Sequence, residues 1–294
     1  MRQNLASLAS YVSEGLIKMR DKENSYKVLL MGGLGNQFFQ IARAIEWRDK
    51  SVGVEVIYIG SKLDWLYRLA GHTKHDSWLD VSVLAENLGL KYRSITLLEL
   101  LFLGFKFLSR RLGIVCVFDE ELDVRLGEKS FIADTWDVGY FQSIRHVSSA
   151  SINKVSYGLS ELLGISEATA RTRIAFHIRG GDFSSVDRVT ADDVRIAIEA
   201  VAGGSARIFV ATNDAKFSSK IFESLDVDFE ISKLPPRADF VAIATAKNVF
   251  VSNSSFAFWA ALCAKNTYNS TVYSLNTWPY GDFLGTPLPK FDSV

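Results

Sequence analysis

The segment from residue 174 to residue 273 alternates between short apolar runs and stretches with apolar residues at helical spacing. Strands are expected at 174–178, 207–211, 249–251 and 271–273, and helices at 192–201, 215–223, 237–246 and 256–264. Strands that alternate with helices predict a parallel, doubly wound α/β sheet. This alternation restricts the fold of the second half of the chain more than any other feature of the sequence.

Three of these expected strands end in polar loops, at 177–182, 212–214 and 252–255. The carboxyl ends of parallel strands meet at one edge of a sheet, so we expect the loops to converge on one pocket. The planar guanidinium of Arg179 matches phosphate oxygens. Serine hydroxyls and the backbone N–H groups that open the helix at Phe256 could bind further oxygens. The sequence therefore predicts a pocket for a phosphate-containing ligand.

A strand–loop–helix–strand unit opens the first half, with a strand at 27–31, a glycine-rich loop at 32–37 and a second strand at 54–59. The dinucleotide-binding fingerprint fails because Phe38 stands where its third glycine would be. Glycines alone would also fit a tight turn between a strand and a helix. The amides of Asn36 and Gln37 favour a ligand-binding loop, since they can cap the helix or reach a sugar or phosphate.

A length of 294 residues suits two domains. We place the first at 1–150, with an amphipathic helix at 4–20, and the second at 151–294, with a helix at 151–163 that could bridge the two. Basic and acidic residues number 33 each, so no net charge draws the chain to nucleic acid.

Residues 60–130 give few signals. His72, His75 and Asp76, with Asp64 upstream, lack the tight spacing of metal ligands, and a solvated loop is favoured over a metal site. Residues 136–143 combine aromatic side chains with Gln and Ser. This cluster suits sugar contact, and it equally suits a packed turn.

The sequence indicates a reducing compartment and no membrane-spanning segment. Cys116 and Cys263 lie in apolar surroundings typical of buried free thiols. Residues 1–19 lack the apolar core of a signal peptide. The apolar run at 97–108 is too short and too charged to span a bilayer. A core helix is favoured there over an amphipathic helix lying on a membrane surface.

Four motifs in this order resemble those of the α-1,2-fucosyltransferases, glycosyltransferase family 11. They lie at 32–40, 139–143, 177–183 and 253–259. The resemblance implies a GT-B-like pair of Rossmann-type, doubly wound parallel-sheet domains, an acceptor-side domain first and a GDP-sugar-binding domain second. It also implies GDP-L-fucose as the donor, a galactoside as the acceptor, and neither a metal nor another cofactor.

The resemblance also implies roles for particular residues. Related fucosyltransferases place the equivalents of His177 and Arg179 against guanine and the β-phosphate. They place an aspartate equivalent to Asp239 against the guanine edge, where a carboxylate pairs with two adjacent N–H donors. The candidate catalytic residues are Arg179, Asn36 (near the fucose) and Asp182. The candidate donor-binding residues are His177, Asp239, Asn253, Ser254, Ser255, Phe256, Gly33, Gly35, Gln37 and Asp214.

One position departs from the family pattern. The usual second arginine of the His-x-Arg-Arg-Gly-Asp motif is Gly180 here, and Arg188 or Arg237 could replace its charge. Phe183 in place of tyrosine is a milder change. The base for the acceptor hydroxyl is not determined; Asp182 is the nearest carboxylate of the motifs, and it could equally cap its own turn.

The expected function is inverting transfer of L-fucose to the 2-hydroxyl of a terminal β-galactoside. The chain resembles bacterial enzymes that build lipid-linked surface polysaccharide, such as O-antigen, in the cytoplasm, with peripheral contact on the inner membrane. Three alternatives stay open: another linkage or GDP-sugar, a degenerate GDP-sugar-binding protein, and a nucleotide-dependent oxidoreductase. The failed glycine fingerprint disfavours the last of these.

Overall fold

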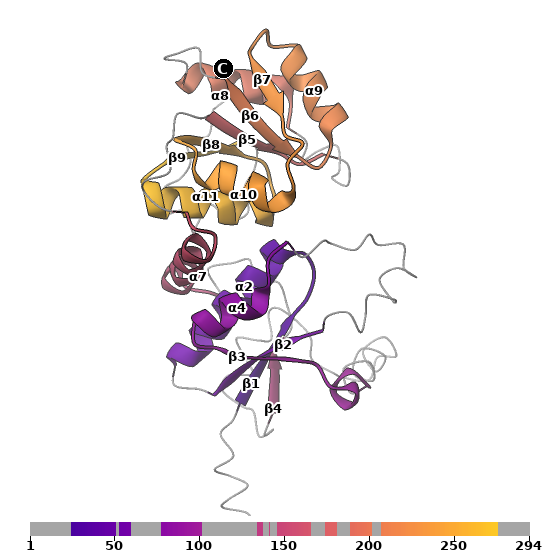
Figure 1. Cartoon of the computed structure of the whole chain (residues 1–294), viewed down its shortest axis with the longest axis vertical. Coiled ribbons are helices and arrows are strands. Elements are labelled where there is room, and N and C mark those ends of the chain that lie inside the picture. The colour runs from indigo at the N-terminus through magenta and orange to yellow at the C-terminus, as the bar shows by residue number, and fades with distance from the viewer. Residues whose placement is uncertain are drawn as a thin grey trace, which may run out of the picture.

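The computed structural model of the chain describes residues 25–50, 53–59, 78–101, 134–137, 141, 146–165, 174–180, 189–201 and 207–275. The expected helix at 4–20, the candidate metal ligands Asp64, His72, His75 and Asp76, and the candidate base Asp182 lie outside these residues. Figure 1 shows two layered halves, one above the other.

The N-terminal half is built on a four-stranded parallel sheet in the order β3-β2-β1-β4. Its strands are β1 (Ser25–Leu30), β2 (Val54–Tyr58), β3 (Lys91–Ser94) and β4 (Asp134–Asp137). Helices α2 (Leu34–Asp49) and α4 (Val81–Asn87) cover one face, because Val28, Leu30 and Val56 share a core with their apolar sides. The opposite face carries a smaller cluster around Leu29 and Ile57.

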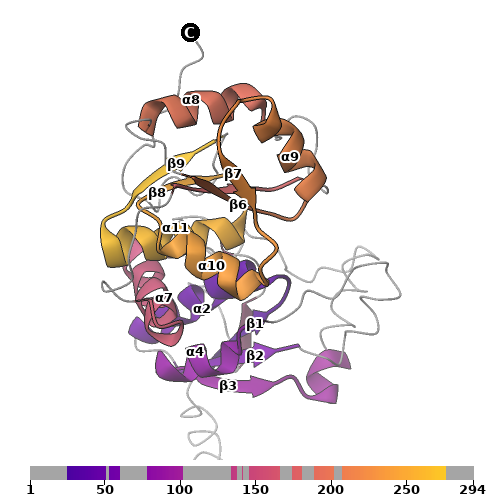
Figure 2. The same ribbon diagram turned by 45° about the horizontal axis from the view of Figure 1, so that its top comes forward.

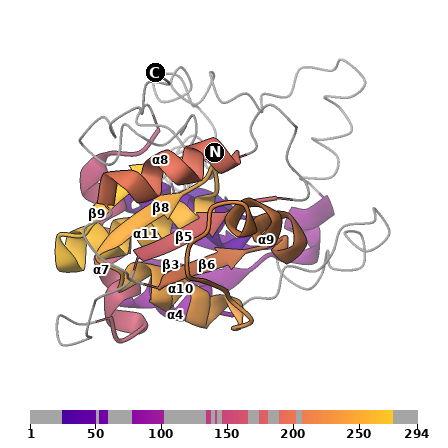
Figure 3. The same ribbon diagram turned by 90° about the horizontal axis from the view of Figure 1, so that it is seen from above.

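The C-terminal half is built on a five-stranded parallel sheet in the order β7-β6-β5-β8-β9. Its strands are β5 (Ile174–Ile178), β6 (Ile208–Thr212), β7 (Phe229–Ile231), β8 (Asn248–Val251) and β9 (Thr271–Ser274). Helices α8 (Ala191–Val201) and α9 (Ala215–Glu223) pack on the outer face (Figures 1 and 3). Helices α10 (Pro236–Ala244) and α11 (Ser255–Tyr268) pack on the inner face.

The two halves share one hydrophobic core. Helix α7 (Ser149–Leu162) lies between them and contacts α2, α4 and α11. One continuous buried cluster joins α2, α4 and α7 to α10 and α11, with Phe39 stacked on Phe258 at 5.0 Å between ring centroids. Figure 2 shows these helices in a layer between the two sheets. The helix expected at 151–163 therefore does lie between the two halves, as predicted.

This architecture confirms the predicted fold class, a GT-B-like pair of Rossmann-like, doubly wound parallel sheets. Both sheets have the strand order of Rossmann folds, in which the direction of winding reverses beside the first strand. The reversal lies between β1 and β4 in the N-terminal half and between β5 and β8 in the C-terminal half. In such sheets, ligands bind at the carboxyl ends of the strands beside this point.

Several local expectations need correction. Helix α4 and the edge strands β3 and β7 were not predicted from the sequence. Trp136 and Asp137, the first residues of the cluster at 136–143, belong to strand β4 and not to a sugar-binding or packed turn. The segment at 97–108 starts a helix at residue 97, and Leu97, Leu98 and Leu101 are exposed rather than in the core. Its remaining residues lie outside the described part. None of the described helices has the length and apolar character needed to cross a bilayer.

A buried ion pair fixes β4 against α2. Arg43 of α2 donates to Asp137 at 2.7 Å, and the side chains of both are less than 10% exposed. The same carboxylate oxygen accepts a bond from the indole of Trp47 at 2.7 Å. Arg43 also donates to the backbone oxygen of His146 at 2.6 Å and lies 5.3 Å above the ring of buried Phe141. These contacts give the polar end of β4 a structural role inside the N-terminal half.

Candidate active site

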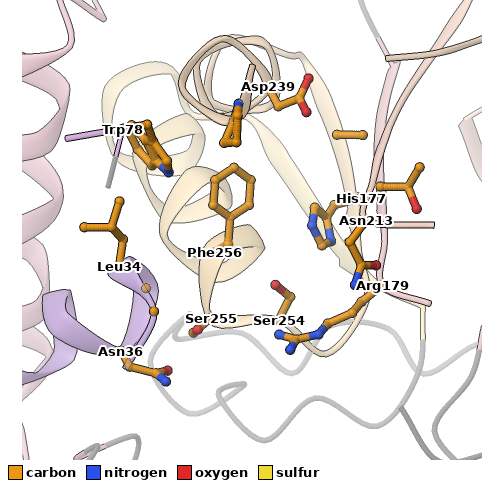
Figure 4. Close-up of a pocket in the computed structure, with 15 residues that line it drawn as sticks. Leu34, Asn36, Trp78, His177, Arg179, Asn213, Asp239, Ser254, Ser255 and Phe256 are labelled. Carbon is orange, nitrogen blue, oxygen red and sulfur yellow. The ribbon is translucent and has the colours of Figure 1, made fainter. Parts of the chain in front are cut away.

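A cavity of about 440 Å³ lies between the two halves. It is lined by loops that follow the strands beside the point where each sheet reverses its winding. Both halves line it (Figure 4): Gly33, Leu34, Gly35, Asn36, Trp78, His177, Arg179, Ala211, Thr212, Asn213, Pro236, Asp239, Ser254, Ser255 and Phe256. Its volume is in the range of small-molecule sites. The strand-end loops that the sequence singled out therefore converge on one pocket.

Arg179 marks one end of the cavity, directly after β5. Its backbone N–H donates to the hydroxyl of Ser252 at 2.8 Å, which ties the ends of β5 and β8 together. The Arg179 guanidinium lies on the same side of the pocket as Ser254 and Ser255 in Figure 4. This end presents a permanent cation beside two hydroxyls, a combination suited to phosphate oxygens.

Two helices begin at this same end. Helix α2 starts at Leu34, inside the glycine-rich loop that was predicted at 32–37. Helix α11 starts at Ser255, with the Ser254 hydroxyl accepting the N–H of Ala257. A Cβ on Gly35 would stand 2.6 Å from the Ser255 carbonyl carbon and 2.7 Å from the Phe256 nitrogen. Only glycine allows so close an approach. Two helix N-termini thus add partial positive charge at one place.

The glycine loop is held in place by hydrogen bonds to two glutamines of helix α2. Gln37 donates its side-chain amide to the oxygen of Gly32 at 2.8 Å, and Gln40 accepts the N–H of Met31 at 2.9 Å. Gly32 has a φ of +76°, a conformation that favours glycine. The indole of Trp259 in α11 donates to the oxygen of Gly35 at 2.8 Å. The loop is therefore held from both halves before any ligand arrives.

His177 lies at the middle of the pocket wall with a side chain almost fully buried. Burial first, and the neighbouring charge of Arg179 second, lower the pKa of His177 to about 4. Its Nδ1 atom has no hydrogen-bond partner among the described residues. The imidazole is neutral at neutral pH, so it offers a ligand hydrogen bonds rather than charge.

Asp239 and aromatic rings form the opposite end of the cavity. Burial raises the pKa of Asp239, although the hydroxyl of Ser232 donates to its carboxylate. Phe256 lies between this end and His177, with ring centroids 5.6 Å apart (Figure 4). Trp78 completes the aromatic wall. The cavity is thus cationic at one end, and flat, apolar and acidic at the other.

Most of the predicted site residues line this cavity, with a few exceptions. Gln37 braces the loop, and Asn253 lies in the loop after β8 without lining the cavity. Asp214 caps α9, where its carboxylate accepts the N–H of Phe217 at 3.0 Å. The neighbouring Asn213 lines the pocket instead. Thr212 and Asn213 belong to the loop at 212–214 that was predicted to reach the pocket, and both line it, whereas Trp78 was not among the predicted residues.

The turn after Arg179 leaves no space for a second arginine. Gly180 is buried, and its N–H donates to the Asn213 side chain at 2.8 Å. A Cβ at Gly180 would stand 2.8 Å from the Asp214 Cβ and 3.0 Å from a ring carbon of Phe217. Arg237 is exposed and does not line the cavity, while Arg188 lies outside the described residues. The family's second arginine is therefore incompatible with this local packing.

The motif at 139–143 has a packing role at its one described residue. Phe141 is fully buried, has a φ of +50° and lies under Arg43. The packed-turn alternative therefore holds for Phe141, and Asp137 just before the motif likewise faces the interior. The described residues also contain no cluster of three or more His, Cys, Asp or Glu suited to a metal ion.

No protein-family model matches the chain, and neither does any curated protein. Solved structures with a similar fold include fucosyltransferase NodZ from Bradyrhizobium, with 12% identity and a TM-score of 0.46 over 81% of this chain and 92% of that chain. POFUT1 in complex with GDP-fucose has 11% identity and a TM-score of 0.43, covering 86% and 99%. Heptosyltransferase WaaC of E. coli with ADP has 9% identity and a TM-score of 0.39, covering 85% and 86%. Sequence identities and TM-scores this low do not support a functional assignment. Any function must therefore be argued from the residues of the pocket.

Proposed function

We propose that this chain is an inverting, metal-independent fucosyltransferase that uses GDP-L-fucose as donor. The observation that supports it most is the polarity of the cavity along its length. Arg179 and two helix N-termini suit a diphosphate, and Asp239 with the aromatic wall suits a nucleobase whose edge carries donors. A nucleoside diphosphate matches both ends at once.

Guanine suits the acidic end because its N1–H and N2–H groups are adjacent donors for one carboxylate. The neutral His177 in the middle supplies hydrogen bonds to the nucleoside without adding charge. Asn36, in the first turn of α2, lines the same cavity, and we assign it to the sugar of the donor. These placements agree with the roles that the motif resemblance implies for His177, Arg179, Asp239 and Asn36.

Transfer would break the bond between C1 of fucose and the β-phosphate oxygen. The acceptor oxygen bonds to C1 from the opposite face, which inverts the anomeric centre, and its proton passes to a base. The leaving diphosphate gains negative charge, so Arg179 and the helix N-termini stabilise the transition state more than the ground state. Asp182, outside the described residues, stays our candidate for the base.

The acceptor we propose is the 2-hydroxyl of a terminal β-galactoside, in lipid-linked surface polysaccharide such as O-antigen. We also propose cytoplasmic location with peripheral contact on the inner membrane. The support for these finer assignments is the order of the four motifs at 32–40, 139–143, 177–183 and 253–259.

The test is incubation of the full chain with GDP-L-fucose and a panel of β-galactosides, with the linkage of the product determined. We expect an α-1,2-linked product that still forms in the presence of a chelator. A galactoside without its 2-hydroxyl is the matched control and should not react. Another linkage would contradict the α-1,2 assignment, and transfer from GDP-mannose but not from GDP-fucose would contradict the donor.

A second candidate is a protein that binds a GDP-sugar without turnover. The observation that favours it is Gly180, because Arg179 is the one arginine among the described residues that line the cavity, where the family pattern has two. Calorimetric titration with GDP-fucose distinguishes the candidates. Tight binding without any product on the acceptor panel would support this candidate, and measurable transfer would exclude it.

A further inference from the structure

Trp78 is an aromatic residue of the N-terminal half that reaches into the C-terminal half. Its ring centroid lies 5.3 Å from that of Phe240 in α10 and 6.0 Å from that of Phe256 in α11, edge-on to the latter. The side chain is half-buried and lines the cavity together with Asp239 and Pro236. It is therefore the aromatic side chain that the N-terminal half adds to the cavity wall within the described residues.

The backbone that carries Trp78 is held firmly. Leu79 and Val81 are buried in the shared core. Asp80 caps α4 by accepting the N–H of Ser82 at 3.0 Å and its hydroxyl at 2.6 Å. These contacts fix the backbone that directly follows Trp78. A preorganised aromatic side chain loses little conformational entropy on binding a ligand.

The chemistry of this end of the cavity matches a nucleobase. A base has apolar faces that stack on aromatic rings and a polar edge that forms hydrogen bonds. Trp78 and Phe256 offer the rings, and Asp239 offers the acceptor beside them. At the other end of the cavity, Arg179 offers a cation suited to phosphate (Figure 4).

We propose that Trp78 contacts the nucleobase of the donor, so that the base subsite is formed by both halves of the protein. This proposal rests on the proposed function, since it assumes a nucleotide donor. It assigns distinct roles to the two residues: Trp78 favours ligands that carry a base, and Asp239 selects among bases by their edge donors. The base subsite is complete only when the two halves are together.

The first test uses calorimetry with GDP and with inorganic pyrophosphate, which lacks the base. We expect Trp78→Ala to weaken GDP binding about 10-fold or more, as is typical of a lost base–aromatic contact, and to change pyrophosphate binding less than about twofold. Trp78→Phe keeps a flat ring and should retain most of the affinity for GDP. Equal weakening of both ligands would show a structural role alone and overturn the proposal, and so would unchanged binding of GDP.

The second test uses the intrinsic fluorescence of the tryptophans, because Trp78 is one of the six in the chain. We expect GDP to quench the wild-type fluorescence and Trp78→Phe to lose most of that quench. Trp136→Phe is the matched control: Trp136 is also half-buried in the N-terminal half, but it lies beside Lys27 and away from the cavity, so the quench should persist. A full quench in Trp78→Phe would overturn the proposal.

These results are separable from a failure of the proposed function. GDP binding without fucose transfer would contradict the fucosyltransferase assignment, and the comparison of the Trp78 variants would still decide the role of this residue. Wild-type protein that binds pyrophosphate and GDP with equal affinity would overturn the Trp78 proposal directly, whether or not fucose is transferred.

Discussion

The two halves share a strand order but use their polar side chains differently. In the C-terminal half, Arg179 and Ser254 follow β5 and β8 and line the cavity. In the N-terminal half, Asp137 at the end of β4 turns inward and pairs with Arg43. The N-terminal half instead gives the cavity a glycine loop, Asn36 and Trp78. We infer that the C-terminal half carries the charged groups of the reaction, and that the N-terminal half provides shape.

The largest expected effect concerns stability and lies in the N-terminal half. Arg43→Leu leaves Asp137 buried without its cation, which should lower the free energy of unfolding by about 3–5 kcal/mol. Urea unfolding measures this loss. The GDP affinity of the folded variant should stay within a few-fold of wild type, because neither residue lines the cavity.

An exposed ion pair provides the control for Arg43. Lys154 and Asp49 form such a pair on the surface, so Lys154→Ala should cost about 1 kcal/mol or less. A small loss of stability in Arg43→Leu, or a large loss of GDP affinity, would break the contrast between the two halves.

The next expected effect lies in the C-terminal half, where a substitution should reduce activity and leave stability nearly unchanged. Arg179→Ala removes the cation that we propose for the leaving diphosphate, and the proposed transfer should fall on the order of a hundredfold or more. The melting temperature should change little, because the Arg179 contact to Ser252 is made by the backbone and survives the substitution. Steady-state kinetics and thermal unfolding measure the two quantities. Normal turnover in this variant would contradict the assignment of the site.

A third effect tests the junction of the two halves. Gly35→Ala places a Cβ against backbone atoms of Ser255 and Phe256 that cannot move aside, so we expect a loss of about 1–3 kcal/mol in unfolding free energy and weaker GDP binding. Gly33→Ala is the matched control for stability. A Cβ at Gly33 meets nothing within 4 Å, and φ is −68°. Equal free energies of unfolding for the two variants would show that the close contact between α2 and α11 does not contribute to the stability of the fold.

The sequence predicted the C-terminal half better than the N-terminal half, for physical reasons. Strand β5 and helix α9 match their expected bounds because β5 is buried throughout and α9 has a clear apolar side. Strands β3 and β7 were missed because edge strands are half-exposed and lack an apolar run. Helix α11 runs four residues past its expected end. Its C-cap is Asn269 in the left-handed conformation, where a glycine would have given a clearer signal in the sequence.

The candidate site was predictable where its polar residues lie in a short segment just after a strand. Arg179 and Ser254 lie in the loops directly after β5 and β8, and Asn36 lies in the first turn of the helix after β1, so the edge rule places all three at the cavity. Trp78 was not predictable, because its role arises from packing against Phe240 and Phe256, distant in the sequence. Conversely, residues 136–143 carry the side chains of a sugar site, yet Asp137 and Phe141 pack inside. Residue type alone does not tell which way a side chain faces.

The smallest expected effect concerns pH and Asp239. Burial raises the pKa of this carboxyl, so its contribution to fold stability is present at low pH and is lost as pH rises through the raised pKa. Guanine requires the ionised form, so GDP affinity should fall as the pH is lowered from about 7 toward the raised pKa of Asp239. Asp239→Asn should bind GDP more weakly at pH 7 and show a flat profile across this range.

The other titratable group of the cavity makes this profile specific to Asp239. His177 has a pKa of about 4, so it stays neutral across the same range and adds no inflection. Calorimetric titrations of wild type and Asp239→Asn at several pH values provide the measurement. A wild-type profile that is flat, or one that keeps its slope in Asp239→Asn, would place the acidic group that binds the base elsewhere in the protein. That outcome would leave Arg179 as the charged group on which the assignment of charged chemistry to the C-terminal half rests.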